Sequence, residues 1–79
     1  MSDQREHEVV ICDVQALGEQ IRRVRRAQQV TQEELADYAG LSRVSVMKVE
    51  KGGDVRLSNL LRLIELLGLE LVVRPRGLK

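Results

Sequence analysis

Hydrophobic residues recur at helical spacing near the start of the chain. Three or four positions separate successive members of this series, which comprises Val14, Leu17, Ile21 and Val24. That spacing places them on one face of an α-helix. Asp13 stands directly before the series, and aspartate is a favoured N-cap residue. We therefore expect a first helix from residue 14 to about residue 28, with its arginines on the opposite face.

A capping box predicts the start of a second helix. Thr31 is followed three residues later by Glu34, so the threonine hydroxyl can accept from one backbone amide while the glutamate reaches back to another. Gly40 ends this helix, because glycine takes the left-handed conformation at a helix end without steric cost.

A third and a fourth helix follow. Ser42 is the N-cap expected for the third, which runs from Arg43 to about Lys51. Ser58 opens the fourth, and Gly68 closes it. The fourth helix is hydrophobic nearly all round, through Leu57, Leu60, Leu61, Leu63, Ile64, Leu66 and Leu67. Such a helix is buried on more than one side, so a partner subunit should cover part of it.

Two short β-branched runs flank the helices. "VVIC" (9–12) predicts a brief strand, and "LELVVR" (69–74) predicts a second that ends at Pro75. A single short strand is not stable alone. The second strand therefore needs a mate, either the first strand of the same chain or the same strand of a second chain.

Length and composition limit the alternatives. The 79 residues form one small domain, with Tyr38 as the only aromatic residue and Cys12 as the only cysteine. No disulfide can form within the chain, which fits a reducing cytoplasm. We find no signal peptide and no hydrophobic run long enough to cross a membrane. The net charge is only +1, so nucleic-acid binding must come from a local basic patch.

The third helix carries such a patch. Arg43 and Lys48 can donate to guanine O6 and N7, whereas Val44 can meet the methyl group of thymine. Met47 is consistent with the same contact and, somewhat better, with a tolerated exposed residue. The first helix adds a cluster of Arg22, Arg23, Arg25 and Arg26. Each of these arginines is equally consistent with a solvated helix face and with a phosphate contact.

The second and third helices together have the features of a helix-turn-helix. A small residue, Ala36, allows close helix approach, Gly40 makes the turn, and Leu41 fills the corner. The stretch "TQEELADYAGLSRVSVMKVEKG" resembles the XRE/Cro helix-turn-helix family, and the resemblance covers residues 15 to 68. It implies a mainly α, four- to five-helix, phage-repressor-like fold that binds double-stranded DNA at a palindromic operator.

The same resemblance implies roles for individual residues. The base readers would be Arg43, Val44, Ser45 and Lys48. The backbone contacts would be Gln32, Ser42, Lys51 and Arg22. The family also commonly ties the positions of Arg25 and Glu50 together, so a structural ion pair is expected there.

The "LGLELVVRPR" ending is similar to that of HipB-type antitoxins. This second resemblance implies a homodimer with a small intermolecular sheet and a HipA-like kinase toxin as partner. The chain then divides into an N-terminal arm (1–12), a DNA-binding domain (13–68) and a dimerisation strand and tail (69–79). Dimerisation would use Leu61, Ile64, Leu69, Leu71 and Val73. The alternatives are a free-standing or phage-type repressor and a protein-interaction module on the same scaffold.

An enzyme is not expected. His7 is the only histidine, Cys12 stands alone, and no metal-ligand spacing or glycine-rich phosphate loop is present in the sequence. The sequence therefore predicts no catalytic residue, no metal and no cofactor.

Overall fold

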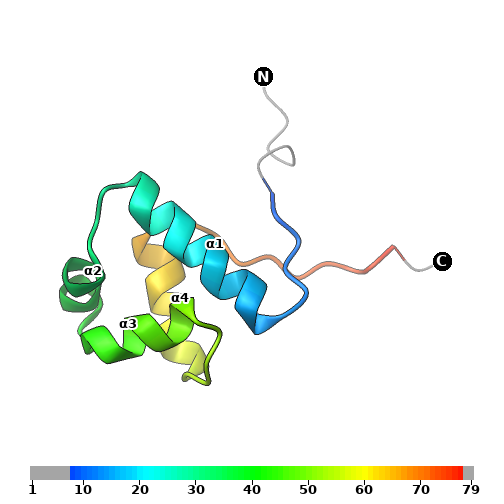
Figure 1. Ribbon diagram of the computed structural model, residues 1–79. Coiled ribbons are helices and arrows are strands. Elements are labelled where there is room, and N and C mark those ends of the chain that lie inside the picture. The colour runs from blue at the N-terminus through cyan, green and yellow to red at the C-terminus, as the bar shows by residue number, and fades with distance from the viewer. Residues whose placement is uncertain (1–7, 78–79) are drawn as a thin grey trace.

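Four helices make up the body of the computed structural model, which describes residues 8–77 (Figure 1). They are α1 (Val14–Ala27), α2 (Gln32–Ala39), α3 (Arg43–Glu50) and α4 (Leu57–Leu66). The four predicted helices are thus all present. Most of the predicted helix ends hold to within a residue or two.

The predicted caps of the first three helices are formed. The Asp13 carboxylate accepts from the Ala16 amide at 2.7 Å. Thr31 and Glu34 complete both halves of the capping box, at 3.0 and 2.9 Å. At the other end of α2, Gly40 takes the left-handed conformation, with φ of 70°. These local bonds fix where α1 and α2 begin and where the chain turns into α3.

The start of α4 differs from the prediction. The helix begins at Leu57, one residue before Ser58, and Arg56 occupies the N-cap position without a side-chain hydrogen bond. An arginine side chain has no acceptor to offer the free amides of a first turn. The serine therefore lies inside the helix and does not cap it.

The core lies where the four helices meet. Ile21, Leu35, Val46 and Leu63, one from each helix, are fully buried. Around them pack the other buried hydrophobic residues, which are Ala36, Ala39, Val49, Ile64 and Leu67. Val14 was expected in this core but is 60% exposed, because it lies in the first turn of α1 beyond the edge of the packed cluster.

Helices α1 and α3 touch through their backbones at Gly18. A Cβ atom placed there would lie 2.3 Å from the carbonyl oxygen of Val49, well inside any real carbon–oxygen contact. The hydrogen side chain of glycine is therefore what lets α3 lie this close to α1. This contact helps to set the angle at which α3 is presented.

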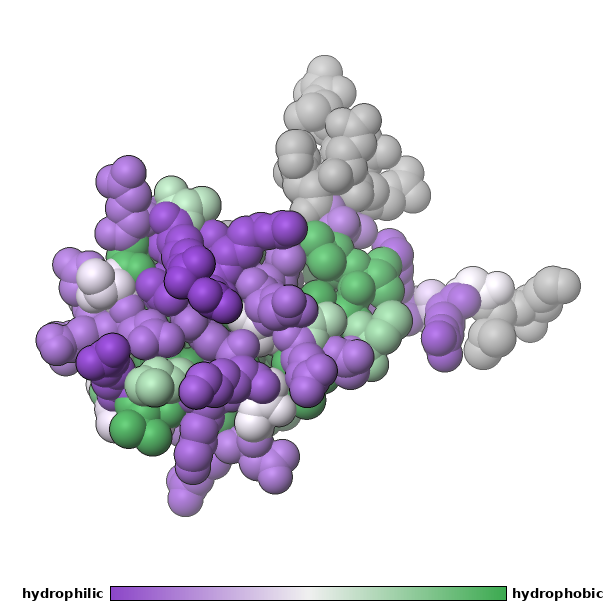
Figure 2. Space-filling view, viewed as in Figure 1, coloured by the Kyte–Doolittle hydropathy of each residue, from purple (hydrophilic) through white to green (hydrophobic). Residues whose placement is uncertain are grey.

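The two predicted strands are absent from residues 8–77, and both segments are extended without a ladder of hydrogen bonds. An exposed ion pair, 3.2 Å long, joins Glu8, just before the first segment, to Arg74 in the second. Extended backbone becomes a strand only when a neighbour accepts its hydrogen bonds. On the face seen in Figure 2, hydrophobic surface gathers where the end segments leave the helices.

Candidate DNA-reading surface

Helix α3 presents one exposed face. Its start is fixed by Ser42, whose hydroxyl accepts from the Ser45 amide at 3.1 Å. Successive residues lie about 100° apart around a helix, so an arc of roughly 140° contains the whole exposed set. That set comprises Arg43, Val44, Lys48 and Lys51, with the partly buried Met47 among them, and Val44 is 59% exposed.

Ser45 does not share this face. It lies about 60° beyond the edge of the arc and is partly buried. Its hydroxyl oxygen lies 3.1 Å from that of Ser42, so the two hydroxyls pair. The structure thus brings Arg43, Val44 and Lys48 together, as expected of readers, and leaves Ser45 beside the cap.

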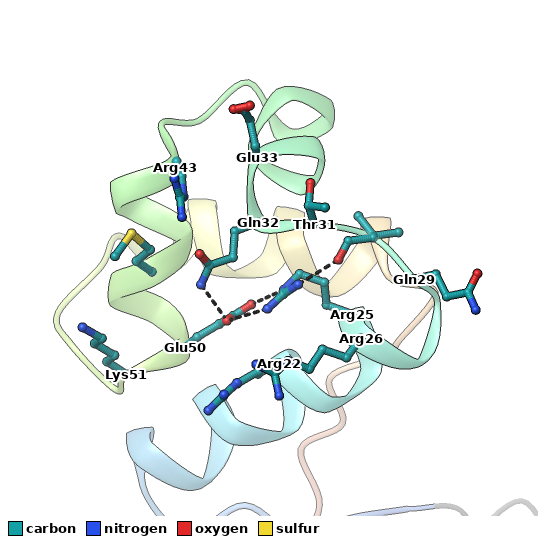
Figure 3. A pocket seen from close by; sticks show the side chains of 12 residues that line it. Arg22, Arg25, Arg26, Gln29, Thr31, Gln32, Glu33, Arg43, Glu50 and Lys51 are labelled. Carbon is teal, nitrogen blue, oxygen red and sulfur yellow. Dashed lines mark hydrogen bonds and ion pairs between the residues drawn. The ribbon is translucent and has the colours of Figure 1, made fainter.

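An open groove runs along one side of the exposed face (Figure 3). Helix α1, the start of α2 and helix α3 all contribute to its lining, together with the loop between α1 and α2. The lining residues are Arg22, Arg25, Arg26, Gln29, Val30, Thr31, Gln32, Glu33, Arg43, Met47, Glu50 and Lys51. Four exposed cations therefore border it, namely Arg22, Arg26, Arg43 and Lys51.

A buried ion pair forms the floor of this groove. Arg25 donates from Nε to Glu50 Oε2 at 2.6 Å and from Nη2 to Oε1 at 3.1 Å. Its remaining nitrogen, Nη1, donates to the Val30 carbonyl at 2.8 Å. The ion pair expected between Arg25 and Glu50 is therefore present, and it joins α1 to the end of α3.

Gln32 lies beside the buried ion pair. Its Nε2 donates to Glu50 Oε1 at 3.0 Å, a bond that the sequence did not suggest, and its contact with the DNA backbone stays a prediction. These partners are separated by eighteen residues, and no local pattern could have revealed the bond. Sequence reasoning also missed the place of Arg26 and Glu33 beside the groove, although Arg26 belongs to the arginine cluster of the first helix.

Two other kinds of site were sought in the described part of the chain. Among residues 8–77, no group of three or more histidine, cysteine or acidic side chains is arranged to hold a metal ion. None of the helices in this part is long and hydrophobic enough to cross a bilayer.

The pattern of the helix-turn-helix family matches residues 21–73, about two-thirds of the chain. This chain belongs to the XRE-type helix-turn-helix family of DNA-binding regulators. The predicted resemblance to that family is thereby confirmed. Among curated proteins, none matches this helix-turn-helix protein at a significant level.

Several solved structures share the fold of this helix-turn-helix protein. The restriction-modification controller protein C.AhdI from Aeromonas hydrophila is 40% identical, with a TM-score of 0.63 over 68% of this chain and 83% of that one. A chain in the HipA-HipB-O2-O3 complex is 21% identical, with a TM-score of 0.81 over 89% of this chain and 100% of that one. The HipB-O4 20mer complex gives 20% identity and a TM-score of 0.80, again over 89% and 100%. At such identity the HipB likeness concerns the fold alone.

Proposed function

We propose that this protein is a sequence-specific repressor that binds a palindromic DNA operator as a homodimer. The observation that carries the proposal is the exposed face of α3, which presents Arg43, Val44 and Lys48. A helix of this width fits the major groove of B-form DNA. Its site of action would be the cytoplasm, where a repressor of this kind meets its operator.

The base contacts follow from the chemistry of the three readers. Arg43 and Lys48 would donate to guanine O6 and N7, and Val44 would pack against a thymine methyl group. Val44 carries no polar group, so it can favour thymine only through contact and exclusion of water. A bidentate arginine–guanine contact should therefore dominate the specificity.

The phosphate contacts would come from the groove and the helix cap. Arg22 and Lys51 border the groove from α1 and from the end of α3. The Ser42 hydroxyl is exposed beside the first turn of α3. Such contacts position the protein without reading sequence, and they make its affinity fall as salt rises.

Dimerisation would use α4 and the C-terminal segment. Leu61 is 41% exposed on α4, and Leu71 and Val73 are exposed beyond it. Leu69 is partly buried and packs against the core. Ile64, predicted to join this surface, is 5% exposed in the core of its own chain, so we now assign it to folding. Two copies would then read half-sites roughly one helical turn, or ~34 Å, apart.

Selection of duplexes from a random pool tests the proposal. The full chain should enrich a palindrome, and Arg43→Ala should relax one position in each half-site. Arg22→Ala should instead weaken binding to every duplex alike and make it less dependent on salt. Enrichment of no sequence at all would favour the protein-interaction module. A monomer in sedimentation at micromolar concentration, with undiminished operator affinity, would contradict the dimer.

The partner we propose is a HipA-like kinase toxin, which would make the repressor an antitoxin that controls its own operon. The support is the HipB likeness, which extends over 89% of this chain. A toxin that binds together with the operator must avoid the α3 face and use another surface. Co-purification with the product of the neighbouring gene tests this. A full chain that bound its operator tightly but retained no such product would be a free-standing repressor.

A second candidate is a controller of restriction-modification genes. It is favoured by the 40% identity to C.AhdI, about twice the identity to the HipB chains. Both candidates predict operator binding, so the neighbouring genes distinguish them. Restriction and modification genes downstream of the operator would favour the controller, and a kinase gene the antitoxin.

A further inference from the structure

A hydrogen bond joins the end of α1 to the end of α4. Gln28, the C-cap residue of α1, donates from Nε2 to the carbonyl oxygen of Leu67 at 2.7 Å. Leu67 is the C-cap residue of α4 and stands 39 positions away in the sequence. A carbonyl oxygen only accepts hydrogen bonds, so the glutamine must turn its NH₂ group toward it. The side chain of Gln28 therefore holds the peptide group with which α4 ends.

The carbonyl that Gln28 binds is one that α4 itself leaves free. The last carbonyl groups of an α-helix have no partner within the helix. Two backbone bonds close the turn through Gly68, and they end on the carbonyls of Ile64 and Glu65, at 2.9 and 3.0 Å. Neither bond uses the carbonyl of Leu67. Within residues 8–77, the partner of that carbonyl is Gln28.

Gly68 is the point where the C-terminal segment (69–77) leaves the helices, beside the end of α1 (Figure 1). Its φ is 76°, and a Cβ atom added there would meet nothing within 4 Å. Because glycine is permissive and no neighbour crowds it, local sterics do not set the direction of the chain at this point. Contacts on either side must do so. Gln28 holds the peptide group before Gly68, and Leu69 packs against the core after it.

The turn that carries Gln28 is also held from the side of the DNA-reading groove. The carbonyl of Val30, two residues further on, accepts from Arg25 Nη1 at 2.8 Å. Arg25 is the cation of the buried pair with Glu50 at the end of α3. The same short turn therefore connects the frame of the reading helix to the start of the C-terminal segment.

We propose that Gln28 is a positioning residue for operator spacing, because it sets the direction in which the C-terminal segment leaves the helices of each copy. The inference rests on the proposed function, in which that segment joins two copies. Once one half-site is bound, binding of the second is intramolecular, and it adds affinity only where the link lets both copies engage together. A firmly held link therefore favours one spacing of half-sites, whereas a loose link accepts several.

The quantity to measure is the spacing ratio: the Kd for an operator with one base pair inserted at its centre, divided by the Kd for the selected operator. The insertion turns one half-site by about 34° and moves it by about 3.4 Å relative to the other. The parent chain should show a ratio of about tenfold or more. Gln28→Met keeps the length of the side chain but removes the donor. We expect it to lower the ratio by about threefold or more while affinity for a single half-site stays within about twofold.

Three further variants sharpen this test. Gln28→Ala, which only removes atoms from an exposed residue, should repeat the result, and thermal melts check that both variants fold. Gln28→Lys should keep the ratio, because an ammonium can still donate to the last carbonyls of a helix and its charge strengthens binding to both operators alike. Gln29→Met should also keep it, since Gln29 is exposed and extends outward from the same turn (Figure 3).

The outcomes separate this inference from the proposed function. A parent that bound the palindrome no better than a single half-site would contradict the dimeric repressor itself. A parent that preferred one spacing, with a Gln28→Met protein that kept the ratio, weakened both operators equally or changed only its melting temperature, would overturn the positioning role alone. A Gln28→Lys protein that lost as much of the ratio as Gln28→Met would overturn it too.

A distance measurement without DNA provides a second test. Spin labels on a chain with Cys12→Ser and Asp37→Cys, two exposed positions, report the distance between the α2 helices of the two copies. Gln28→Met should broaden the distribution of this distance, because the link is held less firmly. Gln28→Lys should leave it as narrow as the parent's. A Gln28→Met distribution no wider than that of the parent would contradict the proposal.

Discussion

The helical head of the molecule (13–53) and its two end segments (8–12 and 69–77) contrast in how their polar and hydrophobic groups are satisfied. In the head, the starts of all three helices are capped by side chains, and the charged pair at the groove floor is hydrogen-bonded. In the end segments, Val10, Val72 and Val73 are exposed by 62% or more, and the backbone lies extended without a ladder.

This difference shows which parts of the molecule reach their final structure within a single chain. The head buries its hydrophobic residues within itself and against α4 of the same chain, so its geometry does not depend on a second copy. The end segments have the composition of strands but lack the neighbour that a strand requires. Substitutions in the head should therefore change folding, whereas substitutions in the end segments should change association.

Removing Glu50 should have the largest effect on the head. Glu50→Ala strands the buried guanidinium of Arg25 and also frees Gln32. Loss of one partner of a buried ion pair typically costs about 3–5 kcal/mol. Urea unfolding of the two proteins measures this difference. Glu65→Ala, an exposed glutamate on α4, is the control and should lie within about 0.5 kcal/mol of the parent. Equal midpoints for Glu50→Ala and Glu65→Ala would contradict the assignment.

Gly18→Ala should come next. Alanine is the better helix former by about 1 kcal/mol, so propensity alone predicts a more stable protein. The added Cβ, however, would meet the Val49 carbonyl at 2.3 Å, and forcing α1 from α3 should cost about 1–3 kcal/mol. The exposed neighbour Glu19 provides the control, since Glu19→Ala changes propensity without this contact. A Gly18→Ala protein that melted higher than the parent would mean that the two helices separate easily.

The head was also the region that the sequence predicted best. Its caps join residues three positions apart, such as Thr31 with Glu34. Such local hydrogen bonds can be predicted from the sequence because they do not depend on how the helices pack. The Arg25–Glu50 ion pair came from family resemblance and could not have been derived from spacing. The Gln32–Glu50 bond was not foreseen, because it depends on how α2 and α3 cross.

The predictions were wrong where burial or strand pairing depends on contacts with other parts of the chain or with a second chain. The fourth helix is hydrophobic nearly all round, and its pattern could not show that Ile64 faces the core of its own chain while Leu61 stays at the surface. Val14 fits the spacing of the first helix, but the core ends before it. The β-branched ends have strand composition, yet composition cannot provide the second strand.

The ends of α1 and α2 allow a smaller test within the head. After each of these two helices the backbone turns through the left-handed conformation, at Gln29 with φ of 61° and at Gly40 with φ of 70°. Gln29→Gly should remove backbone strain and stabilise the fold by about 0.5–1 kcal/mol. Gly40→Ala has open space around it and should destabilise by about 1 kcal/mol from strain alone. Opposite shifts in urea midpoint would support both assignments; shifts of the same sign would contradict one.

Shortening the C-terminal segment should change the folding of the head least of all. The cut belongs after Glu70, because Leu69 is partly buried against the core and its loss would confuse the result. At concentrations low enough for monomers, the free energy of unfolding should stay within about 0.5 kcal/mol of the parent, since residues 71–77 are exposed.

Removing the segment should change how the melting temperature depends on protein concentration. If the segment joins two copies, the melting temperature of the full chain rises with protein concentration by mass action, and the shortened chain loses much of that dependence. A full-length variant with Leu71, Val72 and Val73 all changed to serine is the matched control, because it keeps the chain length and removes only the hydrophobic contacts. It should behave like the shortened chain and bind the palindrome more weakly than the parent, while its affinity for a single half-site stays the same. Identical concentration dependence in all three proteins would place dimerisation on α4 alone.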